Sequence, residues 1–158
     1  MSGFRILTTD WAHDQARLSQ VRRAVFIDEQ GVPEALEWDA DDAGATHFLA
    51  LDDQARAIGC ARLLPDGHIG RMAVLPDWRG RGVGQALLQA VLATALRQGK
   101  RGVSLSAQTH AAGFYARHGF VAEGPVYPEA GIPHIAMHRS LVRMMGLRPF
   151  AAPRDKDK

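Results

Sequence analysis

The sequence predicts a single α/β domain in which helices pack on a central, mixed and mostly antiparallel sheet. Three observations favour this fold class. Apolar runs separated by turn signals follow one another through residues 47–75, as in an antiparallel meander. A long helical periodicity comes next, and a strand, a short helix and further strands follow it, an order that favours one parallel pair made through a crossover. The chain has 158 residues, which is the length of one ordinary domain.

The first 44 residues predict a strand, a helix and an irregular segment. Phe4 to Thr8 has the pattern of a short strand, and Asp10 is a residue type that commonly caps a helix. We expect a helix from Gln15 to Ile27. Its apolar side chains recur at helical spacing: Leu18, Val21, Val25 and Phe26. Glycine, proline and acidic residues interrupt the periodicity over residues 31–44, which indicates an exposed loop or a short irregular helix.

The middle of the chain predicts three strands in series. His47 to Leu51 and Ala57 to Leu64 are separated by the polar turn Asp52-Asp53-Gln54, which is typical of an antiparallel hairpin. Pro65-Asp66-Gly67 is a second strong turn signal. The mostly apolar run from His68 to Leu75 follows it, and we expect a buried strand there.

The second half of the chain predicts one long helix and a strand–helix–strand unit. Gly82 to Gln98 has apolar residues at helical spacing. Val103 to Ala107 is a short apolar strand, and His110 to His118 is a short helix. Phe120 to Val126 and His134 to His138 are expected to be further strands.

Composition excludes several classes of protein. Hydrophobic residues make up 46% and charged residues 23%, values that fit neither a disordered nor a fibrous chain. Ala86 to Leu96, the most apolar stretch, is about half as long as a membrane span. The N-terminus lacks the apolar core of a secretory signal, and Cys60 is the single cysteine, so we expect a cytoplasmic protein. We assign residues 1–141 to one domain and residues 142–158 to a C-terminal extension with a mobile end.

Charge is distributed unevenly along the chain. The formal net charge is only +2, but residues 28–53 contain nine Asp or Glu and no Lys or Arg, while the other residues contain eight Asp or Glu and 19 Lys or Arg. This asymmetry predicts either two partners of opposite charge or a solvated acidic loop. The basic residues are dispersed and no nucleic-acid-reading motif is present, so a nucleic-acid-binding protein is disfavoured.

The most specific local feature is the turn from Arg79 to Gly84, between the strand ending near Val74 and the long helix. A helix start offers unpaired backbone N–H groups, and glycines allow an anion to approach them closely, so this turn is a candidate phosphate cradle. Arg79 and Arg81 add positive charge. The spacing fits neither a dinucleotide fold nor a P-loop. The alternative is an ordinary tight turn.

The stretch from Arg71 to Leu88, RMAVLPDWRGRGVGQALL, resembles the acetyl-coenzyme A signature of the GNAT superfamily of N-acetyltransferases. The core of that signature is R/Q-x-x-G-x-G/A. Arg79, Gly82 and Gly84 stand at its three fixed positions.

A second GNAT signature, N-x-x-A-x-x-x-Y-x-x-x-G-F, is matched downstream by Ala111, Tyr115, Gly119 and Phe120. Gln108 stands where asparagine is usual. Two signatures in the right order make the resemblance specific. The segments VRRAVFIDEQGVPE and GIPHIAM extend it to the ElaA-like or YjcF-like branch, over roughly residues 4–141.

The resemblance implies the GNAT fold, a sheet of six to seven strands that is splayed at its fourth and fifth strands and flanked by about four helices. The strand from His68 to Val74 would carry a bulge and diverge from the strand Val103 to Ala107, and the slot between them would hold the pantetheine arm of acetyl-coenzyme A. The main chain of Met72, Ala73 and Val74 would pair with that arm, with Gln108 and Tyr115 nearby. The pyrophosphate would be held by the amides of Arg79, Gly80, Arg81, Gly82, Val83, Gly84 and Gln85.

The same resemblance implies roles in catalysis. Tyr115 matches the tyrosine that faces the cofactor sulfur, so its hydroxyl is our candidate general acid; the alternative is a core tyrosine. A backbone N–H near Ala73 would stabilise the oxyanion. The base is open. His68 stands where some GNAT enzymes have a catalytic glutamate, Glu29 is a second candidate as base or as anchor for a cationic amine, and His134 is a third; ordered water is the alternative to all of them.

We therefore expect an acetyl-CoA-dependent N-acetyltransferase that acts by direct transfer on the primary amine of a small-molecule or peptidic acceptor. The acidic residues 28–53 predict a cationic acceptor. The rival function is a GNAT-fold regulatory module that binds coenzyme A without turnover. We expect no metal, because the seven histidines are scattered, and we expect Cys60 to be a packed thiol. The resemblance also allows a homodimer.

Overall fold

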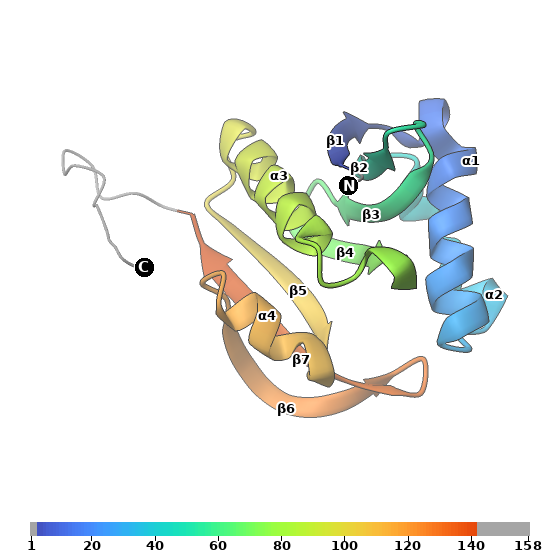
Figure 1. The fold of residues 1–158 in the computed structure, drawn as a ribbon. Coiled ribbons are helices and arrows are strands. Elements are labelled where there is room, and N and C mark those ends of the chain that lie inside the picture. The colour runs from blue at the N-terminus through green and yellow to red at the C-terminus, as the bar shows by residue number, and fades with distance from the viewer. Residues whose placement is uncertain (1–2, 142–158) are drawn as a thin grey trace.

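A computed structural model describes residues 3–141. Its centre is a seven-stranded sheet in the order β1-β2-β3-β4-β5-β7-β6, with helices against both faces (Figure 1). All neighbouring strands are antiparallel except β4 and β5, which are parallel. The strands are β1 (Phe4–Thr9), β2 (Thr46–Asp52), β3 (Ala57–Leu63), β4 (His68–Val74), β5 (Gly102–Gln108), β6 (Val121–Glu129) and β7 (Ile132–Ser140). The predicted fold class is confirmed.

Four α-helices accompany the sheet. They are α1 (Trp11–Arg22), α2 (Glu34–Glu37), α3 (Val83–Arg97) and α4 (Ala112–Ala116). Asp10 caps α1, since its carboxylate accepts a hydrogen bond of 2.9 Å from the His13 amide. The helix therefore begins before the predicted Gln15, and it continues as a π-helical segment over Arg23–Glu29. Short 3-10 turns lie at Ala40–Asp42, Pro76–Trp78 and Thr109–Ala111.

The sheet is buried on both faces along its first strands. In β2, Phe48 and Ala50 pack with α3, whereas Leu49 and Leu51 pack with α1 on the opposite face. Successive side chains of a strand point to opposite faces, so one strand can serve both cores. In Figure 1, α3 and α4 lie in front of the sheet.

The parallel pair β4 and β5 is short. Its register includes only the pairs His68–Ser104 and Ile69–Leu105. Beyond these pairs the two strands diverge, which is the splay that the resemblance implies. In Figure 1, α3 and α4 both lie on one side of this divergence.

The C-terminal extension, residues 142–158, lies outside the described residues, so its boundary stays a prediction. Among residues 3–141, no helix has the length and apolar character needed to cross a membrane.

Candidate functional site

A bulge in β4 shapes the slot between the splayed strands. β3 and β4 are in register at Cys60–Ala73 and again at Arg62–Gly70, so β4 has one extra residue between these pairs. The extra residue is Arg71, whose φ is +49°, a left-handed conformation that costs a non-glycine residue about 1–2 kcal/mol. The fold must therefore hold this bulge by other contacts.

The acidic segment supplies those contacts. The Arg71 guanidinium donates to the Glu37 carbonyl at 3.0 Å, lies 3.1 Å from the Glu37 carboxylate and donates to Asp39 at 3.0 Å. On the β3 side, the Cys60 thiol donates to the Arg71 carbonyl at 3.1 Å. Burial raises the pKa of this thiol to about 12, as expected for a packed cysteine that is no nucleophile.

Main-chain groups alternate in direction along β4 after the bulge. The Leu75 N–H donates to the Ile58 carbonyl of β3, and Ala73 also faces β3, where its amide lies against the Cys60 thiol. By alternation, the N–H groups of Met72 and Val74 point away from β3, into the slot. At the bulge, the N–H that faces the slot is thus that of Met72 rather than that of Ala73.

A paired arginine crosses the end of β4. Arg79 donates from Nε to the Val74 carbonyl at 2.9 Å, and its other two nitrogens bind the Glu29 carboxylate at 2.8 and 2.7 Å. This hydrogen-bonded pair lowers the pKa of Glu29, the opposite of what a base near neutral pH requires. Glu29 is therefore part of an ion pair, and the charge that Arg79 was expected to add to the turn is largely neutralised.

The glycine turn has the geometry of an anion cradle. Gly80 and Gly82 have φ of +77° and +84°, and a Cβ built on either would meet no atom within 4 Å. Gly82 precedes α3 without a side-chain cap, and the first helical hydrogen bond runs from Ala86 N–H to the Gly82 carbonyl. The amides of residues 83–85 therefore precede the helical ladder and are free to bind an anion.

Arg81 adds the remaining charge beside this turn. Its guanidinium lies 4.6 Å from the centroid of the Trp78 ring, a cation–π contact that orients it. Trp78 itself packs edge-on against Phe4, so it is a packing residue rather than a base-stacking one.

Tyr115 lies on the α4 side of the slot. Its hydroxyl is 3.5 Å from Met72 Sδ, and its ring packs against Phe114 and Phe120. Burial raises the pKa of this phenol to about 12, so the group is protonated, and a hydrogen-bond donor, at any physiological pH. The hydroxyl thus lies at the bulge.

His68 lies at the closed end of the slot. It begins β4, and its Nδ1 is 3.2 Å from Ser104 Oγ on β5. Burial lowers the pKa of this imidazole, which keeps it neutral near pH 7.

Gln108 lies at the end of β5, where that strand meets the segment after α1. It donates to the Gln30 side chain at 2.9 Å, and its carbonyl oxygen is 2.7 Å from His110 Nε2. The structure thus gives Gln108 two side-chain partners; its expected contact with the cofactor stays a prediction.

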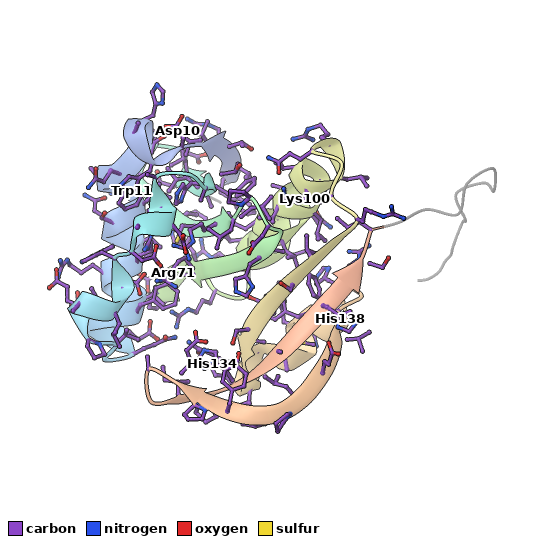
Figure 2. The ribbon with its side chains drawn as sticks, turned by 180° about the vertical axis from the view of Figure 1, so that it is seen from behind. Asp10, Trp11, Arg71, Lys100, His134 and His138 are labelled. Atoms are coloured by element: carbon purple, nitrogen blue, oxygen red, sulfur yellow. The ribbon has the colours of Figure 1, made fainter. Side chains whose placement is uncertain are left out.

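A polar cluster that sequence reasoning largely missed lies on the face away from α4. Ser106 Oγ of β5 is hydrogen-bonded to Tyr127 OH and to the Glu129 carboxylate of β6, and the imidazole of His134 stacks on Tyr127. Figure 2 views this face, with His134 on β7 and Arg71 on β4. The alternation of β5 could have revealed the cluster, because its apolar residues alternate with polar ones. Those polar residues are Ser104, Ser106 and Gln108.

The negative charge of the acidic block, residues 28–53, is compensated by arginines from elsewhere in the chain. Six of its nine carboxylates form ion pairs with arginines. These pairs are Glu29–Arg79, Glu34–Arg23, Glu37–Arg22, Asp39–Arg71, Asp42–Arg22 and Asp52–Arg56. The expectation that this run of acids is uncompensated is therefore wrong, and the cationic acceptor that it predicted stays a prediction.

Metal ligands and a surface hollow are the other features that bear on binding. Within residues 3–141, no three His, Cys, Asp or Glu side chains gather as metal ligands would. A hollow of about 650 Å³ lies between α1 and the end of β4, with Ile58, Leu75 and Trp78 on its wall. Its arginines are already in ion pairs: Arg17 with Asp14, and Arg56 with Asp52.

Comparisons with known proteins agree with this geometry. The family model described as an acetyltransferase (GNAT) domain matches residues 11–141. The uncharacterized N-acetyltransferase YjcF of Bacillus subtilis is 36% identical over 121 residues, covering 74% of this chain and 86% of YjcF. The crystal structure of Escherichia coli ElaA superposes with a TM-score of 0.77 at 32% identity, over 85% of this chain and 99% of that one. The crystal structure of an acyl-CoA N-acyltransferase from Pseudomonas aeruginosa superposes with a TM-score of 0.78 at 34% identity, over 87% of this chain and 99% of that one.

Proposed function

This chain belongs to the GNAT family of acetyltransferases and is an enzyme of that type, and we propose that it transfers an acetyl group from acetyl-coenzyme A directly to the primary amine of a small-molecule or peptidic acceptor. One observation carries the proposal. The slot-facing main chain at Met72 and Val74 leads along β4 to the open glycine turn at Gly80 and Gly82. An extended arm that ends in a pyrophosphate fits this path.

The residues present suit coenzyme A at each part of the path. Met72 and Val74 would pair with the amides of the pantetheine arm, once Arg79 has released the Val74 carbonyl. The uncapped amides at the start of α3 would hold the pyrophosphate, in space that no side chain occupies. Arg81 would add one positive charge there.

Bound acetyl-coenzyme A supplies a thioester, whose carbonyl carbon is open to attack by an amine. The Met72 amide would stabilise negative charge on the carbonyl oxygen, and the Tyr115 hydroxyl would donate to the departing sulfur. A phenol with a pKa of about 12 is a weak acid, so its contribution is stabilisation of the thiolate by a hydrogen bond as the sulfur gains a proton. The amine must also lose a proton before it attacks. The function alone does not identify the group that accepts this proton.

The acceptor would enter on the face that carries the polar cluster. We propose that a preference for a cationic acceptor comes from Glu129 at the β6–β7 turn, because most of the carboxylates of residues 28–53 are paired. A cytoplasmic location and a homodimer stay predictions from the sequence.

Free thiol release from acetyl-coenzyme A, measured against a panel of amines, tests the function. Stoichiometric thiol and acetylated amine support an acetyltransferase. Cofactor binding without thiol release, across cationic, neutral and anionic amines, would favour the regulatory module instead.

A further inference from the structure

We propose that His134 is the general base of the transfer, with Nε2 taking the proton that the acceptor ammonium must lose. The inference rests on the proposed function and names a residue for the step that the function leaves open. It also revises the order of the three candidates named from the sequence, among which His68 came first.

The two nitrogens of His134 have different environments. Nδ1 lies 2.7 Å from the backbone carbonyl oxygen of Ile132. A carbonyl can only accept, so Nδ1 carries the hydrogen, and in the neutral ring Nε2 then has the lone pair. The Tyr127 ring stacks on the imidazole, with centroids 6.2 Å apart and planes 29° apart, and fixes its orientation.

Nε2 remains accessible although the ring is only 6% exposed. Across residues 3–141, Arg62 Nε is the one side-chain nitrogen or oxygen that is both buried and without a hydrogen-bond partner. His134 Nε2 makes no hydrogen bond in the described part of the chain, and its nearest charged partner is the Glu129 carboxylate at 3.9 Å. It must therefore retain contact with solvent. One anchored and one accessible nitrogen is the arrangement that a base requires.

Strand pairing places His134 at the open end of the divergence between β4 and β5. β4 and β5 pair only at His68–Ser104 and Ile69–Leu105, so His68 lies at the closed end. Gln108 is the last residue of β5, beyond this pairing, and it is directly opposite His134 in the next pair of strands. His134 is thus on the side of the divergence that Met72 also reaches, whereas His68 is at the end where the two strands still meet.

The two proton-handling groups lie on opposite faces of the sheet. Tyr115 approaches Met72 from the α4 side. On β7, Ile135 and Met137 face the α3 core, so His134 faces the other side, together with its partner Gln108. An amine that attacks from the His134 face would leave the sulfur on the Tyr115 face.

Three elements surround the His134 ring. Glu129 and Tyr127 face it from β6, and Gln108 faces it from β5, with His110 bonded to Gln108 on the far side. The Glu129 carboxylate is 3.9 Å from Nε2, on the path between the ring and solvent that the transferred proton would take.

The proton balance is complete without a further reactant. One N–H bond of the acceptor ammonium breaks, its electron pair stays on nitrogen, and the proton bonds to His134 Nε2. The freed pair attacks the acetyl carbon, the carbon–sulfur bond breaks, and the nitrogen loses a second proton while the thiolate gains one. The reaction releases one proton overall in addition to the amide and the thiol. The imidazolium returns this proton to solvent past Glu129.

The test compares His134→Gln with the matched control His138→Gln. His138 is four residues along the same strand, on the same face, and its imidazole is 3.2 Å from Glu123. We expect His134→Gln to lower kcat/KM by roughly 10²- to 10⁴-fold and to remove the acidic limb of its pH profile, with the control like wild type. Stabilisation by acetyl-coenzyme A should be retained in both variants, which shows that fold and cofactor binding are intact.

Two further measurements separate a base from a structural histidine. One measurement compares two acceptors. The activity lost in His134→Gln should be much smaller with an alkoxyamine, which is already neutral at pH 7, than with an alkylamine. Glu129→Gln, at an exposed position, should fold even if His134→Gln does not, and should lower kcat/KM for the alkylamine more than for the alkoxyamine. An unchanged limb in His134→Gln, or equal losses for both amines in either variant, overturns the proposal alone. A wild-type protein that acetylates no amine overturns the proposed function, and this assignment with it.

Discussion

Replacement of Gly82 by leucine should abolish stabilisation by acetyl-coenzyme A and leave a folded protein. Gly82 has φ of +84° immediately before α3, and a Cβ there would meet no atom within 4 Å. The new side chain therefore has room in the free protein. It would occupy the space above the uncapped amides, where the pyrophosphate is proposed to bind.

The cost of a non-glycine residue at Gly82 and the stabilisation by acetyl-coenzyme A are both large enough to measure separately. A non-glycine residue in the left-handed region costs about 1–2 kcal/mol, which lowers the melting temperature of a chain of this size by about 2–8 °C. A ligand at a hundredfold excess over its Kd adds about 2.7 kcal/mol, or about 5–11 °C. The wild-type shift should thus be clear, and the variant should melt lower and show no shift.

Melting curves with and without acetyl-coenzyme A measure both effects, and Gly99→Leu is the matched control. Gly99 follows the other end of α3, with φ of +79° and the same open space, so its substitution has the same backbone cost far from the cradle. The control should retain the full shift. A full shift in Gly82→Leu, or an equal loss in both variants, would refute the assignment of this turn.

The other predictions concern single side chains. Tyr115→Phe should lower kcat by roughly ten- to ten-thousandfold with cofactor stabilisation retained; an unchanged kcat would return Tyr115 to a packing role. Asp42→Ala should cost about 3–5 kcal/mol in urea unfolding, because it breaks the buried ion pairs of Asp42 with both Arg22 and Arg62, whereas exposed Asp41→Ala should cost less than about 0.5 kcal/mol. Burial lowers the pKa of His47, so its contribution to stability is present above about pH 6.5 and lost below it, and His47→Gln should flatten that slope. Glu129→Gln should remove any excess of kcat/KM for a cationic over a neutral amine; an unaltered ratio would show that Glu129 does not select the acceptor.

The order and type of the main elements could be predicted from the sequence because they depend on local signals. The helix predicted from Gly82 to Gln98 is observed as Val83–Arg97, and every predicted strand overlaps an observed one. Boundaries were less accurate where no apolar pattern exists. α1 begins at Trp11 because the Asp10 cap fixes its first turn. That turn has no apolar periodicity from which it could be predicted.

The candidate site was predictable only where its residues lie in motifs. The glycine turn and Tyr115 match written signatures, and the structure places both along the slot. Ser106, Tyr127 and Glu129 belong to no motif, and they meet only because β5, β7 and β6 are neighbours in the sheet. Strand order is a property of the whole fold, so residues 20 or more positions apart could not be joined by a reading of local pattern.

The acidic segment shows most clearly what a charge count leaves out. Among its arginine partners, Arg22 is on α1, Arg62 on β3 and Arg71 on β4, and charge along the sequence does not reveal a pair between distant elements. Glu37 and Asp39 bind Arg71, the residue with the strained φ at the bulge, and thereby hold the strand in the shape that turns the Met72 amide into the slot. We therefore expect the segment to act on catalysis through geometry rather than through its electrostatic field. Added salt, which screens exposed charges beyond about 8–10 Å, should then leave kcat nearly unchanged even though nine of the protein's 17 acids lie in this one stretch.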